Sequence, residues 1–122
     1  MEKSIIHFRT VDWQHVEMVE PLREYSSDTI NYIEAHFEFN HGWRNCDRLY
    51  CSWSVGDVVE FTDVPENDVV VIPQKLLKLV GTLQMNLVAQ DHKDHDRTNL
   101  VTCRNTSYPI DVLKTRRAKV QP

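Results

Sequence analysis

The chain has 122 residues, of which 41% are hydrophobic and 26% charged, and its formal net charge is −4. This length fits one domain with a real hydrophobic core, but not two. With this acidic balance, nothing in the composition suggests a basic surface that would bind nucleic acids or anionic membranes. No apolar run has the length of a membrane span or of a signal peptide. From the charge and the apolar runs together, we expect neither a nucleic acid nor a membrane as partner.

The chain begins with two apolar stretches, SIIHFR and VDWQHVEMVEPL, which carry more apolar surface than a free linker would. We treat residues 1–19 as an N-terminal strand or arm. In one interpretation it joins the domain's own sheet. In the other, which we favour slightly, it docks on a neighbouring subunit, because unpaired strand edges invite pairing. Ile5, Phe8 and Trp13 are then candidate assembly contacts.

Residues 20–114 show the two-residue period of half-buried strands. Apolar and polar residues alternate at 33–39, 49–54, 58–62 and 83–89, and further β-rich runs read VVVI, NLVTC and YPIDVL. Such runs recur about every ten residues, which is typical of an antiparallel sandwich or barrel. We predict an all-β protein, an antiparallel β-sandwich of about seven to nine strands. A single short helical turn is predicted at PQKLLKL.

The predicted strand at 33–39 ends at a turn and a large aromatic residue. Asn40, His41 and Gly42 are residue types that tolerate a positive φ, and Trp43 follows them directly. A tryptophan in this place closes the end of a sandwich by folding over the core. The alternative is an exposed aromatic cluster that binds sugar or peptide. The predicted core is Phe37, Phe39, Trp43, Leu49, Trp53, Ile72, Leu77, Leu83 and Leu87, with Pro73 and Gly81 as further fold-defining residues.

The three cysteines, Cys46, Cys51 and Cys103, lack the spacing of a zinc site or a disulfide framework. Reduced thiols in a protein that matures in a cytosol are the simplest interpretation, and a Cys46–Cys51 disulfide is the alternative.

The stretch QDHKDHDR is the strongest candidate for a metal site. It places Asp91, His92, Asp94, His95 and Asp96 within six residues, and such groups ligate divalent metals. It lies between two predicted strands, however, where a polar hairpin loop is expected, and no second element closes the ligand set. The sequence also lacks a nucleophile motif, a P-loop and His-Glu-x-x-His. We therefore predict no catalytic residue, no cofactor and no metal.

The C-terminal stretch, residues 115–122, is polar and basic. It is either a frayed terminus or a second arm ordered against a neighbouring subunit. Arg116, Arg117 and Lys119 are its candidate contacts.

Over residues 20–113 the order of these features resembles small virion domains of tailed bacteriophages, akin to the N-terminal domain of upper baseplate proteins. In that pattern a Phe-x-Phe strand leads to a turn and a tryptophan. A strand with a glycine at its end, an Ile-Pro with a leucine turn, and a glycine before another strand follow. The matching residues here are Phe37, Phe39, Trp43, Gly56, Ile72, Pro73, Leu76, Leu77 and Gly81. One departure is the link at 45–48, Asn-Cys-Asp-Arg, which is more polar than the pattern.

The resemblance implies a sandwich without catalysis that is repeated around a symmetric particle. We therefore expect a non-enzymatic virion structural protein, a docking or decoration subunit of the tail baseplate or the capsid. Its partners would be other virion proteins and further copies of itself, and assembly would take place in the bacterial cytoplasm. One alternative is a carbohydrate- or host-surface-binding module that uses Tyr25, Trp13 and Tyr108. Another is a small inhibitor of a host protein.

Overall fold

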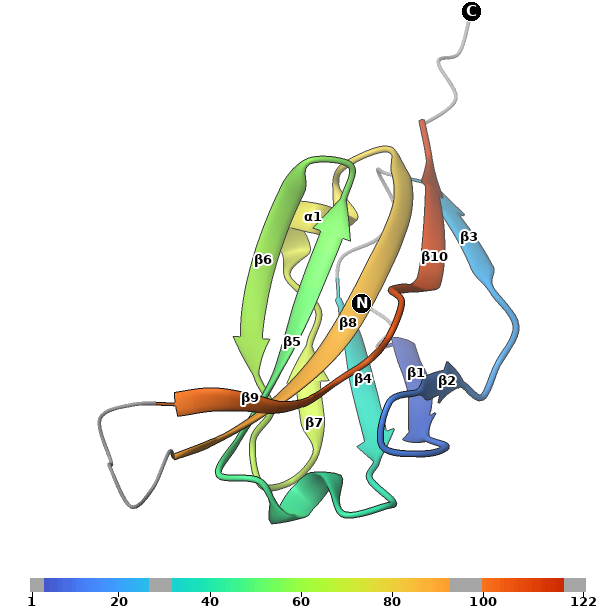
Figure 1. Cartoon of the computed structure of the whole chain (residues 1–122). Helices are drawn as coiled ribbons and strands as arrows, with labels where there is room; N and C mark the ends of the chain where they lie inside the picture. Colours follow the sequence, from blue (N-terminus) through green and yellow to red (C-terminus); the bar gives the residue numbers. More distant parts are fainter. Residues whose placement is uncertain (1–3, 27–31, 93–99, 118–122) are drawn as a thin grey trace, which may run out of the picture.

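The structure, a computed structural model, describes residues 4–26, 32–92 and 100–117. These residues form ten strands, a 3-10 turn η1 (Trp43–Asn45) and a four-residue helix α1 (Gln74–Leu77). The strands make two sheets around one core (Figure 1). The predicted all-β class is confirmed. None of the helices in the described ranges is long and apolar enough to cross a membrane.

The first sheet contains both N-terminal strands. Its order is β2 (Val16–Met18), β1 (Ser4–Thr10), β4 (Ile33–Glu38) and β7 (Val69–Val71). β1 pairs with β2 in antiparallel fashion but with β4 in parallel, from Ser4 opposite Ile33 to Arg9 opposite Glu38. β1 is therefore an interior strand of this sheet, with Ile6 and Phe8 each 1% exposed.

The second sheet is built around the longest strand, β8 (Gly81–His92). Its order is β3 (Arg23–Ser26), β10 (Ile110–Arg116), β8, β5 (Arg48–Val55) and β6 (Val58–Asp63), and β9 (Leu100–Asn105) also pairs with β8. β10 runs parallel to β3, and the other pairings in this sheet are antiparallel.

Two details differ from the sequence-based expectation. The sheets are mixed, because β1–β4 and β10–β3 are parallel, and the described residues hold ten strands instead of seven to nine. Alternation of apolar residues marks one buried face but not the direction of the neighbouring strand. The segment at 4–18 belongs to the domain's own sheet, which was the less favoured of the two interpretations.

The core lies between the two sheets, with Trp43 and Trp53 fully buried. Phe37, Leu49, Ile72, Leu77, Leu83 and Leu87 are buried as well, whereas Phe39 is only partly buried and stacks on Phe37. Pro73 precedes the first residue of α1. Gly81 has a φ of 143°, and a Cβ there would lie 3.1 Å from Val55 Cγ1, so a side chain would crowd the start of β8.

The turn after β4 has the predicted backbone. His41 and Gly42 have φ values of 61° and 82°, and Trp43 is 0% exposed. The Trp43 Nε1–H donates to the Asp12 carbonyl at 2.8 Å. This bond connects the turn to the β1–β2 hairpin and satisfies the indole N–H inside the core.

We expect Trp43→Ala to lower the free energy of unfolding by about 3–5 kcal/mol, because it leaves a large cavity and an unpaired carbonyl. Trp13→Ala is the matched control, since the Trp13 side chain is exposed; it should change the free energy by less than about 0.5 kcal/mol. Urea denaturation followed by circular dichroism measures both. A loss below about 1 kcal/mol for Trp43→Ala would contradict the packing described.

A chain that begins at Glu20 should not fold, because it lacks the interior strand β1 and its partner β2. A chain that begins at Ser4 keeps all the strands of the described residues and is the control. Circular dichroism should show a cooperative thermal transition for the control alone. Cooperative unfolding of the shorter chain would mean that β1 is dispensable.

Candidate functional site

The turn between β1 and β2 is a well-ordered surface element. The Val11 N–H donates to the His15 carbonyl at 3.0 Å, and the Gln14 N–H donates to Asp12 Oδ1 at 2.7 Å. His15 Nδ1 lies 2.8 Å from the same carboxylate. The Gln14 N–H first, and His15 second, lower the pKa of Asp12. This turn presents Trp13, whose side chain is 55% exposed.

A second exposed aromatic residue lies on the segment beside this turn. The Ser107 N–H donates to the Gln14 carbonyl at 3.0 Å, and this bond holds the 106–108 segment against the turn. Tyr108, next along the chain, is 78% exposed. We call Val11, Trp13 and Tyr108 the hairpin tip. Tyr25, the third residue considered for an aromatic platform, is partly buried against the core instead.

The other predicted assembly contacts are dispersed. Arg116 and Arg117 are exposed, with Arg116 Nε 3.6 Å from Glu24 Oε2, and Ile5 is half-buried. Phe8 is not a surface residue, which corrects the expectation: it stacks on Phe37 at 5.2 Å because both side chains point inward from neighbouring strands. Lys119 lies outside the described residues.

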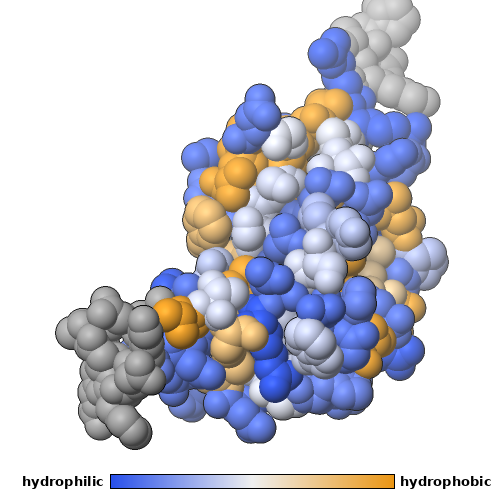
Figure 2. Space-filling model, viewed as in Figure 1, coloured by the Kyte–Doolittle hydropathy of each residue, from blue (hydrophilic) through white to orange (hydrophobic). Residues whose placement is uncertain are grey.

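The outer face of the second sheet carries a small aromatic pair that the sequence analysis did not single out. Phe61 is 65% exposed and meets Tyr50 edge-on at 6.0 Å. Its strand β6 points Thr62 inward, where Thr62 accepts the Trp53 Nε1–H at 2.7 Å. Figure 2 shows apolar side chains scattered among hydrophilic ones in this view, not one continuous patch.

A hollow of about 710 Å³ lies beside the link that follows Trp43. Its two arginines are paired: Arg44 Nε donates to Asp68 Oδ1 at 2.8 Å, and the Arg48 guanidinium donates to Asp63 Oδ1 at 2.9 Å. These ion pairs neutralise the positive charge, so the hollow does not resemble an anion-binding site.

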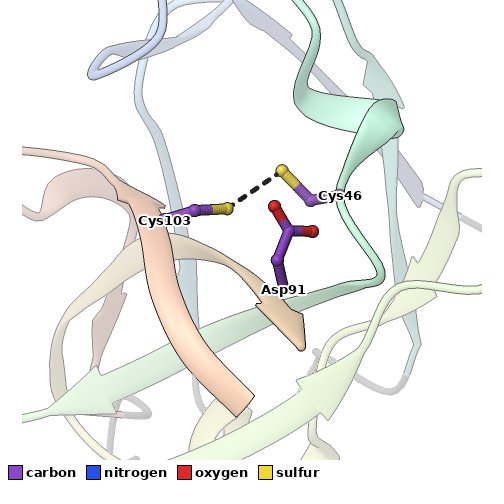
Figure 3. Close-up of side chains that lie close together, drawn as sticks. All are labelled: Cys46, Asp91 and Cys103. Carbon is purple, nitrogen blue, oxygen red and sulfur yellow. Dashed lines mark hydrogen bonds between the residues drawn. The ribbon is translucent and has the colours of Figure 1, made fainter. Parts of the chain in front are cut away.

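Two thiols and a carboxylate meet at one end of the second sheet (Figure 3). Cys46 Sγ lies 3.1 Å from Cys103 Sγ, and Asp91 lies beside both. Although the residue as a whole is exposed, partial desolvation of its sulfur, then Cys46 and Asp91, raise the pKa of the Cys103 thiol to about 12. The Cys46–Cys51 pairing does not occur, because Cys51 is buried in the core, where desolvation raises the pKa of its thiol.

The polar stretch that begins at Asp91 divides between two sets of partners. Asp91 joins the two cysteines, whereas His92 donates its backbone N–H to Asp47 Oδ2 at 2.8 Å and places Nδ1 2.8 Å from the same oxygen. These bonds lower the pKa of Asp47. Asp94, His95 and Asp96 lie outside the described residues. Sequence spacing missed the grouping of Asp91 with Cys46 and Cys103, because only strand pairing brings the three together.

No family model and no curated protein sequence matches the chain. Solved structures, in contrast, do match the chain. Its fold resembles that of the N-terminal domain of phage TP901-1 ORF48. The match has a TM-score of 0.55 and 12% sequence identity, and it covers 95% of this chain and 99% of that domain. At this identity the likeness is one of fold, and it agrees with the phage-domain resemblance inferred from the sequence.

The three thiols should differ in reactivity with iodoacetamide, because the thiolate is the nucleophile and it must be accessible. In the reduced, folded protein Cys51 should be labelled about a hundredfold more slowly than Cys103, since Cys51 is 0% exposed and Cys103 is exposed. The Cys103 rate should rise about tenfold per pH unit from pH 8 to 11, below a pKa of about 12. Mass spectrometry of peptides measures both, and a pH-independent Cys103 rate would contradict the raised pKa.

Proposed function

We propose that the protein is a non-enzymatic structural protein of a phage virion, a docking subunit of the tail baseplate. The observation that carries the proposal is the fold likeness to a phage protein domain, which extends over 95% of this chain and 99% of that domain. The order of residues from Phe37 to Gly81, which resembles the N-terminal domain of upper baseplate proteins, supports the same assignment. The alternative within the class of virion structural proteins is a subunit that decorates the capsid.

The hairpin tip is the surface we assign to docking on another virion protein. Trp13 stands on a turn that hydrogen bonds already order, and Tyr108 stands on the segment that is hydrogen-bonded to this turn. Little conformational entropy is therefore lost when a partner covers the hairpin tip. Tryptophan and tyrosine are also the residues that most often dominate binding energy at protein interfaces. The proposal assigns no catalytic or cofactor-binding residue.

The same surface supports a second candidate function, the binding of a carbohydrate on the host surface. Exposed Trp13 and Tyr108 lie on segments joined by one hydrogen bond, and aromatic faces of this kind pack against sugar rings. No observation of comparable weight favours the small-inhibitor alternative.

The proposal is tested on purified particles of the phage that encodes the chain. Peptide mass spectrometry should find the chain at a fixed ratio to the major virion proteins, and gold labelling should place it on the tail. Its absence from purified particles would overturn the virion role. Label on the head would overturn the baseplate location and support capsid decoration.

The double variant Trp13→Ala with Tyr108→Ala should reduce incorporation into particles about tenfold or more, because it removes both aromatic anchors. Phe61→Ala is the control, since it removes an aromatic residue from the second sheet whose exposure lies between those of Trp13 and Tyr108. Both variants should keep the wild-type circular dichroism spectrum. Normal incorporation of the double variant, together with loss of binding on a glycan array, would favour the carbohydrate candidate.

A further inference from the structure

The cluster of Cys46, Asp91 and Cys103 is formed by segments far apart in the sequence. Cys46 and Cys103 are 57 positions apart, yet their sulfur atoms are within 3.1 Å. One ligand atom from each of the three residues lies within 4.8 Å of the others. It is the only group of three or more metal-binding side chains of this kind among the described residues. Figure 3 shows the three side chains directed toward one another from three elements.

Each of the three side chains is positioned by a backbone feature. Cys46 is the residue that caps the C-terminal end of η1, and its N–H donates to the Trp43 carbonyl at 3.4 Å. Asp91 Oδ1 accepts the Asp47 N–H at 2.8 Å, which orients the carboxylate. Cys103 is the extra residue of a β-bulge: the β8–β9 register passes from Arg104 to Thr102 and omits it. Bulges redirect a side chain out of the normal alternation, often beside functional sites.

Among the residues that the structure describes, no ion pair joins an arginine, lysine or histidine to this cluster. Two thiols and a carboxylate carry up to three negative charges when deprotonated, and the nearest arginines along the chain are committed elsewhere. Arg44 binds Asp68, Arg48 binds Asp63, and Arg104 donates to the His41 carbonyl. Like charges at this distance are stable only when protons or a metal ion lie among them.

We propose that Cys46, Cys103 and Asp91 bind a zinc ion, with water as the fourth ligand. Two thiolates favour a soft or borderline metal over calcium or magnesium, and a carboxylate oxygen is also a ligand that zinc accepts. With Zn–S bonds of about 2.3 Å, tetrahedral geometry separates two sulfur atoms by about 3.7 Å. The thiols therefore have to move apart by only about half an ångström when the ion enters.

The bound ion would connect the Trp43 turn to the β8–β9 hairpin. Each cysteine that ligates gives its proton to the solvent, so binding should release protons and weaken as the pH falls. Because the ion binds the folded chain, it should also raise the melting temperature by mass action. The zinc-site proposal does not depend on the proposed virion role, so finding or not finding the chain in particles does not affect it.

The test uses the full chain, reduced and freed of metal, and Zn²⁺ alone as the probe. Isothermal titration calorimetry should show one zinc ion per chain, with proton release that changes with the buffer's ionisation enthalpy. Cys46→Ser, Cys103→Ser and Asp91→Asn should weaken binding, the cysteine variants roughly a hundredfold or more. Substitution with Co²⁺ should give a thiolate-to-metal charge-transfer band in the wild type, which tests the site without any variant.

Two controls match the substitutions elsewhere in the chain. Cys51→Ala removes the core thiol and Asp57→Asn removes an exposed carboxylate, and both should keep wild-type zinc affinity. Wild-type binding no tighter than that of the Cys46→Ser/Cys103→Ser double variant would overturn the proposal. A second outcome would also overturn it: the chain binds no zinc, but reduces glutathione disulfide to two glutathione thiols and forms a Cys46–Cys103 disulfide. The two cysteines would then be a redox pair.

Discussion

The hydrogen bond from the Trp43 indole to the Asp12 carbonyl joins the core to both candidate sites. Asp12 organises the turn that presents Trp13, so the buried indole fixes the position of the hairpin tip. Trp43 also begins the turn η1, whose last hydrogen bond holds Cys46. Because burial of a large aromatic ring is worth several kcal/mol, one side chain in the core keeps two distant surface features in place.

The neighbouring bonds reinforce this arrangement. The Asn40 N–H donates to Thr10 Oγ1 at 2.6 Å, and the Thr10 hydroxyl lies 3.1 Å from the Asn40 carbonyl. Thr10 is 1% exposed, so this polar group is satisfied inside the protein. These bonds hold the ends of β1 and β4 side by side. Trp13 lies on the connection that leaves β1, and Cys46 lies on the connection that leaves β4.

Features of the fold and of the candidate sites that depend on neighbouring residues could be predicted from the sequence, whereas those that depend on distant strand pairing could not. The period of two, the positive φ at His41 and Gly42, and burial of Trp43 depend on neighbouring residues, so the sequence predicted them. Parallel pairing of β1 with β4 leaves no such local mark. The approach of Cys46 to Cys103 could not be predicted from the sequence either, because it depends on a bulge in the β8–β9 register and on segments 57 positions apart.

The parallel pairing of β10 with β3 affects the order in which the chain acquires structure during synthesis. β10 lies between β3 and β8, so β3 joins the second sheet only after β10 has been made. β3 has no other strand partner among the described residues, so it stays unpaired while β4 to β9 are synthesised. Contacts of such long sequence separation form slowly. Closure of the second sheet is therefore expected to be a late step of folding, and until then the edges of β3 and β8 that β10 covers are unpaired.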